Sequence, residues 1–206
     1  MFVINCNKFK WKKVRYLLFV YLQLISIYTY AQRRKNTEII WSKDSILKWN
    51  DFRNIKHDLA GDAASQTFTN IFCTPSNCLN DTVQITCYCA LNKELSWGIK
   101  MYETPQLLNH EQKHFDITEI HTRLLRKAMA NKKFKYWCFY RQFRRLYNKA
   151  LKAESQEQSL YDKETDHGLR SLNQKKWDAK IANELKALDA YSDIHVTVRL
   201  RHFLFF

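Results

Sequence analysis

Two histidines and a glutamate supply the clearest chemistry in the chain. The segment His110-Glu111-Gln112-Lys113-His114 has the pattern H-E-x-x-H. In an α-helix, side chains four residues apart lie on one face, so His110 and His114 can bind one metal ion from the same side. Glu111 cannot join them as a ligand, but it can reach a water on the metal. Zinc hydrolases use this arrangement, with the glutamate as general base. The pattern therefore predicts a Zn²⁺ site with Glu111 as a catalytic residue.

The helix itself provides no obvious third ligand, which a zinc site needs. His121 shares a face with His114 but lies roughly 10 Å further along the helix axis, out of reach of the same ion. Asp116 and Glu119 are turned away around the helix, which favours supporting or structural roles for both. The third ligand is therefore expected from another element.

The polar segment 161–168 is the best source of that ligand, because we expect it to be a loop that folds back on the helix. His167 is the preferred candidate, since histidine is the commonest metal ligand. Asp162 and Glu157 remain open alternatives. Tyr161, in the same segment, is the candidate donor for the oxyanion that forms during hydrolysis of an amide.

The elements around the motif predict an α+β fold, with strands first and helices after. Alternating or β-branched segments at 65–73, 83–91 and 95–102 indicate a small antiparallel meander. Thr104-Pro105 is a strong helix start, with threonine at the N-cap and proline at the first helical position. Helices are expected over 105–129, 132–159 and 171–190. The segment 95–102, just before the first helix, is the expected edge for an extended peptide or protein substrate.

Composition limits the function classes. The 206 residues suit one domain, and the hydrophobic fraction of 46% allows a packed core. The three glycines form neither the dinucleotide-binding nor the P-loop pattern, which excludes both readings. The net charge of +14 is typical of proteins that meet nucleic acid or an anionic membrane.

Much of that charge lies in residues 131–150, where aromatic residues recur at helical spacing. We expect a core-facing aromatic stripe with a solvated basic rim. Contact with an anionic membrane or cell-wall surface is the alternative. We expect no nucleic-acid partner, because the N-terminus predicts export. The stripe consists of Tyr136, Tyr140, Phe143 and Tyr147.

Residues 1–31 read as a signal peptide: a basic start, an apolar run from Tyr16 to about Ile27, and small residues before Gln32. Cleavage after Ala31 would give a secreted or periplasmic protein. The alternative is a membrane anchor formed by residues 16–31, although the run is short for a span. An exported chain permits disulfides. Cys73 and Cys78 could close a small loop.

The string from Leu108 to Glu119, LNHEQKHFDITE, resembles a bacterial family of unknown function that is often labelled secreted zinc-dependent protease and is similar to the zincin peptidases. Weaker matching pieces cover roughly residues 40–190. The resemblance implies a zincin-like fold and peptidase activity. The pieces are Leu47–Phe52, Leu95–Trp97, Tyr161-Asp162, Thr165, His167-Gly168 and Gln174–Trp177.

The sequence thus predicts a signal peptide (1–31), a zincin-like metallohydrolase domain (32–193) and a C-terminal tail (194–206). The tail alternates from Ile194 onwards, which is compatible with a last strand or a disordered end. The favoured hypothesis is an exported zinc peptidase that uses Glu111 as general base. One alternative is a zinc-binding module without catalysis in the periplasm. Another is a membrane-anchored basic interaction protein in which the motif is accidental.

Overall fold

The computed structural model describes residues 16, 19–23, 25–26, 37–56 and 63–202. The chain divides into two units, Met1–Glu38 and Ile39–Phe206. Most of residues 1–31, the predicted signal peptide or anchor, lies outside the described residues, as does the tail from residue 203. Among the described helices, none is both long and apolar enough to cross a membrane.

The larger sheet is built around one long strand, β5 (Thr82–Asn92). On one side it pairs antiparallel with β4 (Thr69–Pro75). On the other side it pairs with β1 (Glu38–Ile40) and antiparallel with β8 (His195–Arg201). The short strand β7 (Phe134–Lys135) lies parallel to β8. The sheet is therefore mostly antiparallel. Of the predicted meander, the segments 65–73 and 83–91 overlap β4 and β5, which pair in it, but the segment 95–102 does not join this sheet.

Strand β8 lies within the segment 194–206 that the sequence assigned to a C-terminal tail. It alternates exposed and buried residues, so that Val196, Val198 and Leu200 face the core. Because it lies between β5 and β7, it is an interior strand of the sheet. The segment predicted as a C-terminal tail thus continues the domain at least to Arg201.

A second, smaller sheet has the order β2–β6–β3. It consists of β2 (Asn54–Ile55), β6 (Trp97–Gly98) and β3 (Ser65–Gln66), with β2 parallel and β3 antiparallel to β6. The strand predicted over 95–102 is therefore much shorter. It gives way to a 3₁₀-helix at Lys100–Tyr102.

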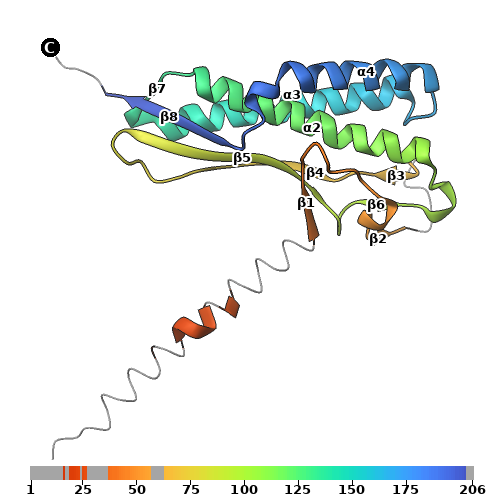
Figure 1. The fold of residues 1–206 in the computed structure, drawn as a ribbon, viewed down its shortest axis with the longest axis horizontal. Helices are drawn as coiled ribbons and strands as arrows, with labels where there is room; N and C mark the ends of the chain where they lie inside the picture. The colour runs from red at the N-terminus through yellow and green to blue at the C-terminus, as the bar shows by residue number, and fades with distance from the viewer. Residues whose placement is uncertain (1–15, 17–18, 24, 27–36, 57–62, 203–206) are drawn as a thin grey trace, which may run out of the picture. The chain divides into compact units, whose positions relative to one another are not determined.

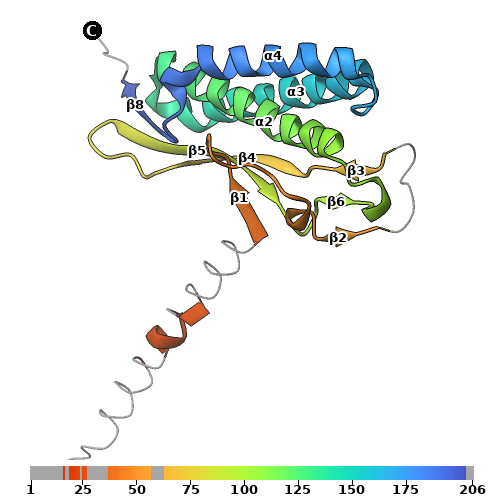
Figure 2. The same cartoon turned by 45° about the vertical axis from the view of Figure 1, so that its right-hand side comes forward.

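Three helices cover one face of the larger sheet (Figures 1 and 2). They are α2 (Pro105–Asn131), α3 (Phe139–Thr165) and α4 (Ser171–Ala187). The predicted start of α2 is confirmed, since the Thr104 side chain accepts a hydrogen bond from the backbone N–H of Leu107. Helix α3 begins and ends later than predicted, so most of the expected loop 161–168 is helical.

The main core lies between the sheet and α2 and α3. It includes Ile85, Leu125, Met129 and Phe134, all at most 2% exposed. One disulfide joins Cys73 to Cys87, which face each other across β4 and β5. The suggested pairing of Cys73 with Cys78 is therefore wrong. The mixed α+β class, with a small sheet and several helices, is confirmed.

Candidate metal centre

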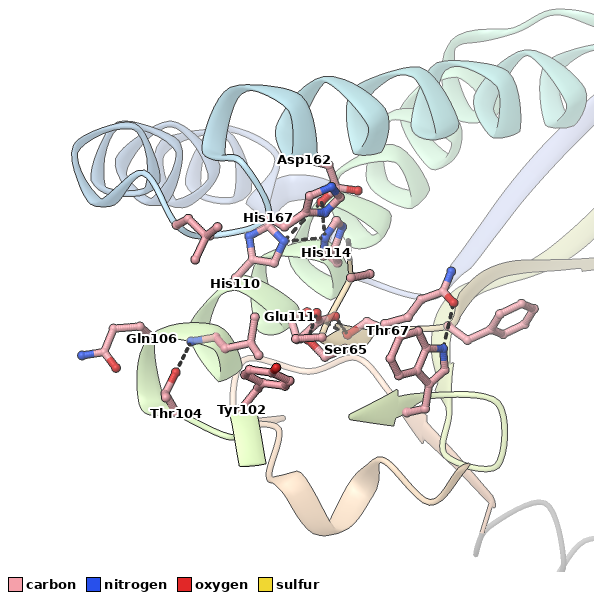
Figure 3. Close-up of a pocket in the computed structure, with 18 of the residues that line it drawn as sticks. Ser65, Thr67, Tyr102, Thr104, Gln106, His110, Glu111, His114, Asp162 and His167 are labelled. Atoms are coloured by element: carbon pink, nitrogen blue, oxygen red, sulfur yellow. Dashed lines mark hydrogen bonds and ion pairs between the residues drawn. The ribbon is translucent and has the colours of Figure 1, made fainter. Parts of the chain in front are cut away.

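Helices α2 and α3 bring three ligand-type atoms together. His110 and His114 lie one turn apart on α2, and their Nε2 atoms are 3.0 Å from each other. Asp162, on the last turns of α3, places its Oδ1 atom 2.9 Å from Nε2 of His114 and 3.2 Å from Nε2 of His110. Figure 3 shows the three side chains converging between the two helices.

The chemistry of this donor set fits a metal ion. Its three atoms all lie within 4.8 Å of one another. Tetrahedral ligands about 2.0–2.1 Å from a zinc ion are ~3.3 Å apart, close to the separations found here. Two imidazole nitrogens and a carboxylate oxygen are also the kind of set that divalent transition metals prefer. The residues His110, His114 and Asp162 thus form a candidate metal-binding triad.

Two glutamines orient the histidine rings. Nδ1 of His114 lies 2.5 Å from Oε1 of Gln158, and Nδ1 of His110 lies 3.2 Å from Oε1 of Gln174. Because an amide oxygen only accepts hydrogen bonds, each ring donates from Nδ1 and directs its Nε2 atom towards the triad. Gln174 is held in turn by Asp178, 2.8 Å from its Nε2.

Removing the acceptor at Gln158 should weaken metal binding without removing a ligand. Gln158→Met keeps the approximate size of the side chain but leaves His114 free to rotate and to change tautomer. We expect a loss of about 10–100-fold in metal affinity, measured by competition with a chelator. Gln156→Met, at an exposed position of the same helix, is the matched control and should bind as wild type. Equal affinities for both variants would contradict the orienting role.

The triad is electrostatically coupled. Burial lowers the pKa of His114, but the hydrogen bond to Asp162 and the charges of Glu111 and Asp162 raise it, for a net value of about 9. Burial raises the pKa of Asp162, yet the hydrogen bonds from His110 and His114 outweigh it and hold that pKa well below its usual range. Asp162 therefore presents an ionised carboxylate, the form that binds a cation.

Glu111 lies in the same pocket, on the side facing the small sheet. Its carboxylate accepts hydrogen bonds from the hydroxyls of Ser65 and Thr67, both at 2.5 Å (Figure 3). The side chain is 2% exposed. Ser65 belongs to β3, so the small sheet fixes the carboxylate beside the triad. Both histidines, Glu111 and Asp162 line one cavity of about 670 Å³.

The turn after α3 closes the other side of the pocket. Asp166, His167 and Gly168 all have positive φ angles, which ends the helix and reverses the chain. Gly168 has φ of 85°, and a Cβ atom there would lie 3.0 Å from Cβ of His110. Glycine is therefore required both by its backbone conformation and by the close approach to a triad residue.

The sequence preferred His167 as the third ligand, but the structure brings Asp162 into the triad. His167 lies at the rim of the same cavity, with its side chain 47% exposed and Nδ1 3.6 Å from Oδ1 of Asp162. Glu157, the other alternative, is paired elsewhere, with Nε2 of His121 at 2.8 Å and with Lys180. Because α3 continues as far as Thr165, Asp162 lies on the helix and faces α2.

Tyr161 does not point into the cavity, so its predicted role as an oxyanion donor has no geometric basis. It is fully buried, and its ring stacks on His110 with the ring centres 4.6 Å apart. Its hydroxyl contacts Gln174 and the carbonyl oxygen of His110. Burial raises its pKa. Tyr161 therefore holds the His110 ring in position by stacking on it.

Sequence reasoning missed Ser65, Thr67 and Gln158 as site residues. Ser65 and Thr67 lie more than 40 positions before Glu111 and approach it only through tertiary packing. Gln158 carried no signal beyond its place in a predicted helix. Asp116 and Glu119 have structural partners, as expected: Asp116 accepts from Trp41 and Lys113, and Glu119 pairs with Arg123 and Arg126.

No curated protein and no solved structure matches the chain. One family model matches part of the chain, and the matched segment is shorter than residues 40–190, the range that the sequence resemblance covered. It runs from β6 through α2 and α3 and ends at Gly168, so it includes the whole triad, Glu111 and His167. Residues 97–168 match the family model described as a bacterial protein of unknown function (DUF922).

Proposed function

We propose that this chain is a zinc-dependent hydrolase, acting as a peptidase on extended peptide or protein substrates outside the cytoplasm. One observation carries the proposal: the triad of His110, His114 and Asp162 opens into a cavity of about 670 Å³ that Glu111 also lines. A purely structural zinc site is normally closed by four protein ligands, whereas a catalytic site keeps three and an open position.

Each residue has a role that follows from its contacts. A zinc ion held by the triad would supply a Lewis acid and lower the pKa of water towards ~7. Glu111 is positioned to take the proton from an attacking water and to return it to the leaving amine. Ser65 and Thr67 keep that carboxylate in place through two hydrogen bonds. Gln158 and Gln174 hold the two histidine rings.

The small sheet suggests where a substrate would lie. In the order β2–β6–β3, strand β6 is paired on both sides, whereas β3 has one edge without a partner among the described strands. Addition of an extended peptide to a sheet edge is a common mode of recognition. Strand β3, rather than the predicted segment 95–102, is therefore the candidate edge, and Ser65 on it already contacts Glu111.

The test is cleavage of a mixed peptide library by the wild-type protein, before and after zinc removal. We expect cleavage that a chelator abolishes and stoichiometric zinc restores, because the metal is needed at the open position. Inspection of the products by mass spectrometry would give the preferred residues. Zinc-loaded protein that cleaves nothing in the library would favour the non-catalytic zinc-binding module instead.

A further inference from the structure

The start of α3 and the short 3₁₀-helix just before it, Tyr136–Cys138, expose three large aromatic side chains at the end of α3 furthest from the triad. Tyr136 is 48%, Trp137 54% and Tyr140 65% exposed. The prediction that the aromatic stripe faces the core is therefore only partly correct. Phe143 and Tyr147 pack against the core, whereas Tyr136 and Tyr140 are exposed. A contiguous exposed aromatic group on a folded domain is a typical sign of an interaction surface.

The same region is strongly basic. Residues 131–153 contain eight lysines and arginines and no aspartate or glutamate. The carboxylate of Asp81 lies nearby but is paired with His202, whose ring stacks on Tyr136. We define the aromatic–basic surface as seven exposed residues of this region: Lys133, Lys135, Tyr136, Trp137, Tyr140, Arg141 and Arg144.

A cavity of about 400 Å³ adjoins this surface where β7 meets β8. Its lining contributes four cationic side chains and no acidic one: Lys132, Lys133, Arg199 and Arg201. A concave site of this composition suits a phosphate group with its negative charge, because several cations can contact the phosphate oxygens at once.

We propose that the aromatic–basic surface docks on membranes that contain anionic phospholipids. The tryptophan and tyrosine rings have an apolar body and a polar edge, which suits the level of the lipid headgroups. The lysines and arginines match the negative surface, and the adjoining cavity takes headgroup phosphates. The Cys73–Cys87 disulfide suits a compartment outside the cytoplasm, where membrane lipid rather than nucleic acid is the available polyanion.

The proposal is independent of the hydrolase assignment. Arg141 and Asp162 are both on α3, so the surface and the triad lie roughly 30 Å apart at 1.5 Å per residue. Substitutions on the surface should therefore leave zinc binding unchanged.

The test is flotation of the full chain with phosphatidylcholine vesicles, with and without phosphatidylglycerol. We expect preferential binding to the anionic vesicles, weakened by salt. Arg141→Glu/Arg144→Glu should lower the affinity at least ~10-fold, because each cation near an anionic surface contributes substantially. Lys175→Glu/Lys176→Glu, the same charge change at exposed positions of α4, is the matched control. Because the N-terminal segment is common to all variants, only differences between them report on this surface.

A second measurement tests insertion of the aromatic residues. Vesicles with brominated acyl chains should quench part of the tryptophan fluorescence of wild-type protein, and Trp137→Phe should lose that part. Equal vesicle binding by the arginine variant and the control would overturn the proposal. So would binding to single-stranded DNA with no preference for anionic vesicles, which would indicate a nucleic-acid surface.

Discussion

Replacing Glu111 by glutamine is expected to lower peptide hydrolysis by about 10²–10⁴-fold while zinc content stays at the wild-type level. The amide keeps the size of the side chain and one acceptor oxygen for Ser65 or Thr67. It cannot take a proton from the attacking water. Metal content should not change, because the three triad atoms come from His110, His114 and Asp162.

Glu154→Gln is the matched control for this substitution. Glu154 lines the same cavity, but its carboxylate contacts Thr118 and Gln158. We expect its hydrolysis rate to stay within a few-fold of wild type, since a positioned base rather than any nearby carboxylate carries the reaction. A Glu111→Gln variant as fast as wild type, or a Glu154→Gln variant as slow as Glu111→Gln, would show that the base is misassigned.

The second large effect is on stability, and it concerns Glu119. Its carboxylate is 2% exposed and accepts hydrogen bonds from Arg123 at 2.9 Å and Arg126 at 3.0 Å, two guanidinium groups that are each 1% exposed. Glu119→Gln removes the counterion that both buried charges share and leaves Arg123 only the exposed Asp189, 3.6 Å away. We expect the free energy of unfolding to fall by about 3–5 kcal/mol, measured by urea denaturation monitored by circular dichroism.

The control for that experiment is Glu94→Gln, which removes the exposed ion pair between Glu94 and Arg53. Exposed pairs contribute about 0–1 kcal/mol, so the same chemical change there should be nearly silent. If Glu119→Gln cost no more than Glu94→Gln, the backbone carbonyls around Arg123 and Arg126 would already satisfy those side chains. Glu119 would then contribute no more to the free energy of unfolding than an exposed carboxylate.

The helical half of the candidate site could be predicted from local sequence. The spacing of His110 and His114 determines that they share a face, and Thr104-Pro105 marks where α2 begins. Both are short-range features, so a single sequence contains them. The role of Gly168 against His110, by contrast, depends on how the turn after α3 folds back.

The remaining half of the site depends on contacts distant in sequence. Whether Asp162 or His167 is the third ligand depends on whether α3 ends before or after residue 162. The polar residues of this segment have no hydrophobic repeat that would mark the end of the helix. The hydroxyls of Ser65 and Thr67 reach Glu111 only after β3 packs beside α2. The Cys73–Cys87 pairing follows from the register of β4 on β5, which the loop between the strands determines.

The position of strand β8 in the sheet likewise depends on contacts between residues distant in sequence. Its alternating pattern was visible, but nothing local says that it inserts between β5 and β7 instead of ending the chain as a tail. Its neighbour β7 lies about 65 residues earlier, within a segment whose composition predicted helix. Two residues, Phe134 and Lys135, pair with β8 instead, and this delays the start of α3.

The most direct test of the central claim is the zinc content of three purified proteins: wild type, Asp162→Ala and His167→Ala. The triad predicts one zinc per chain in wild type and in His167→Ala, whose side chain lies at the rim of the cavity. It predicts loss of zinc from Asp162→Ala, because only two ligands remain. Zinc retained by Asp162→Ala and lost from His167→Ala would contradict the triad and make His167 the third ligand.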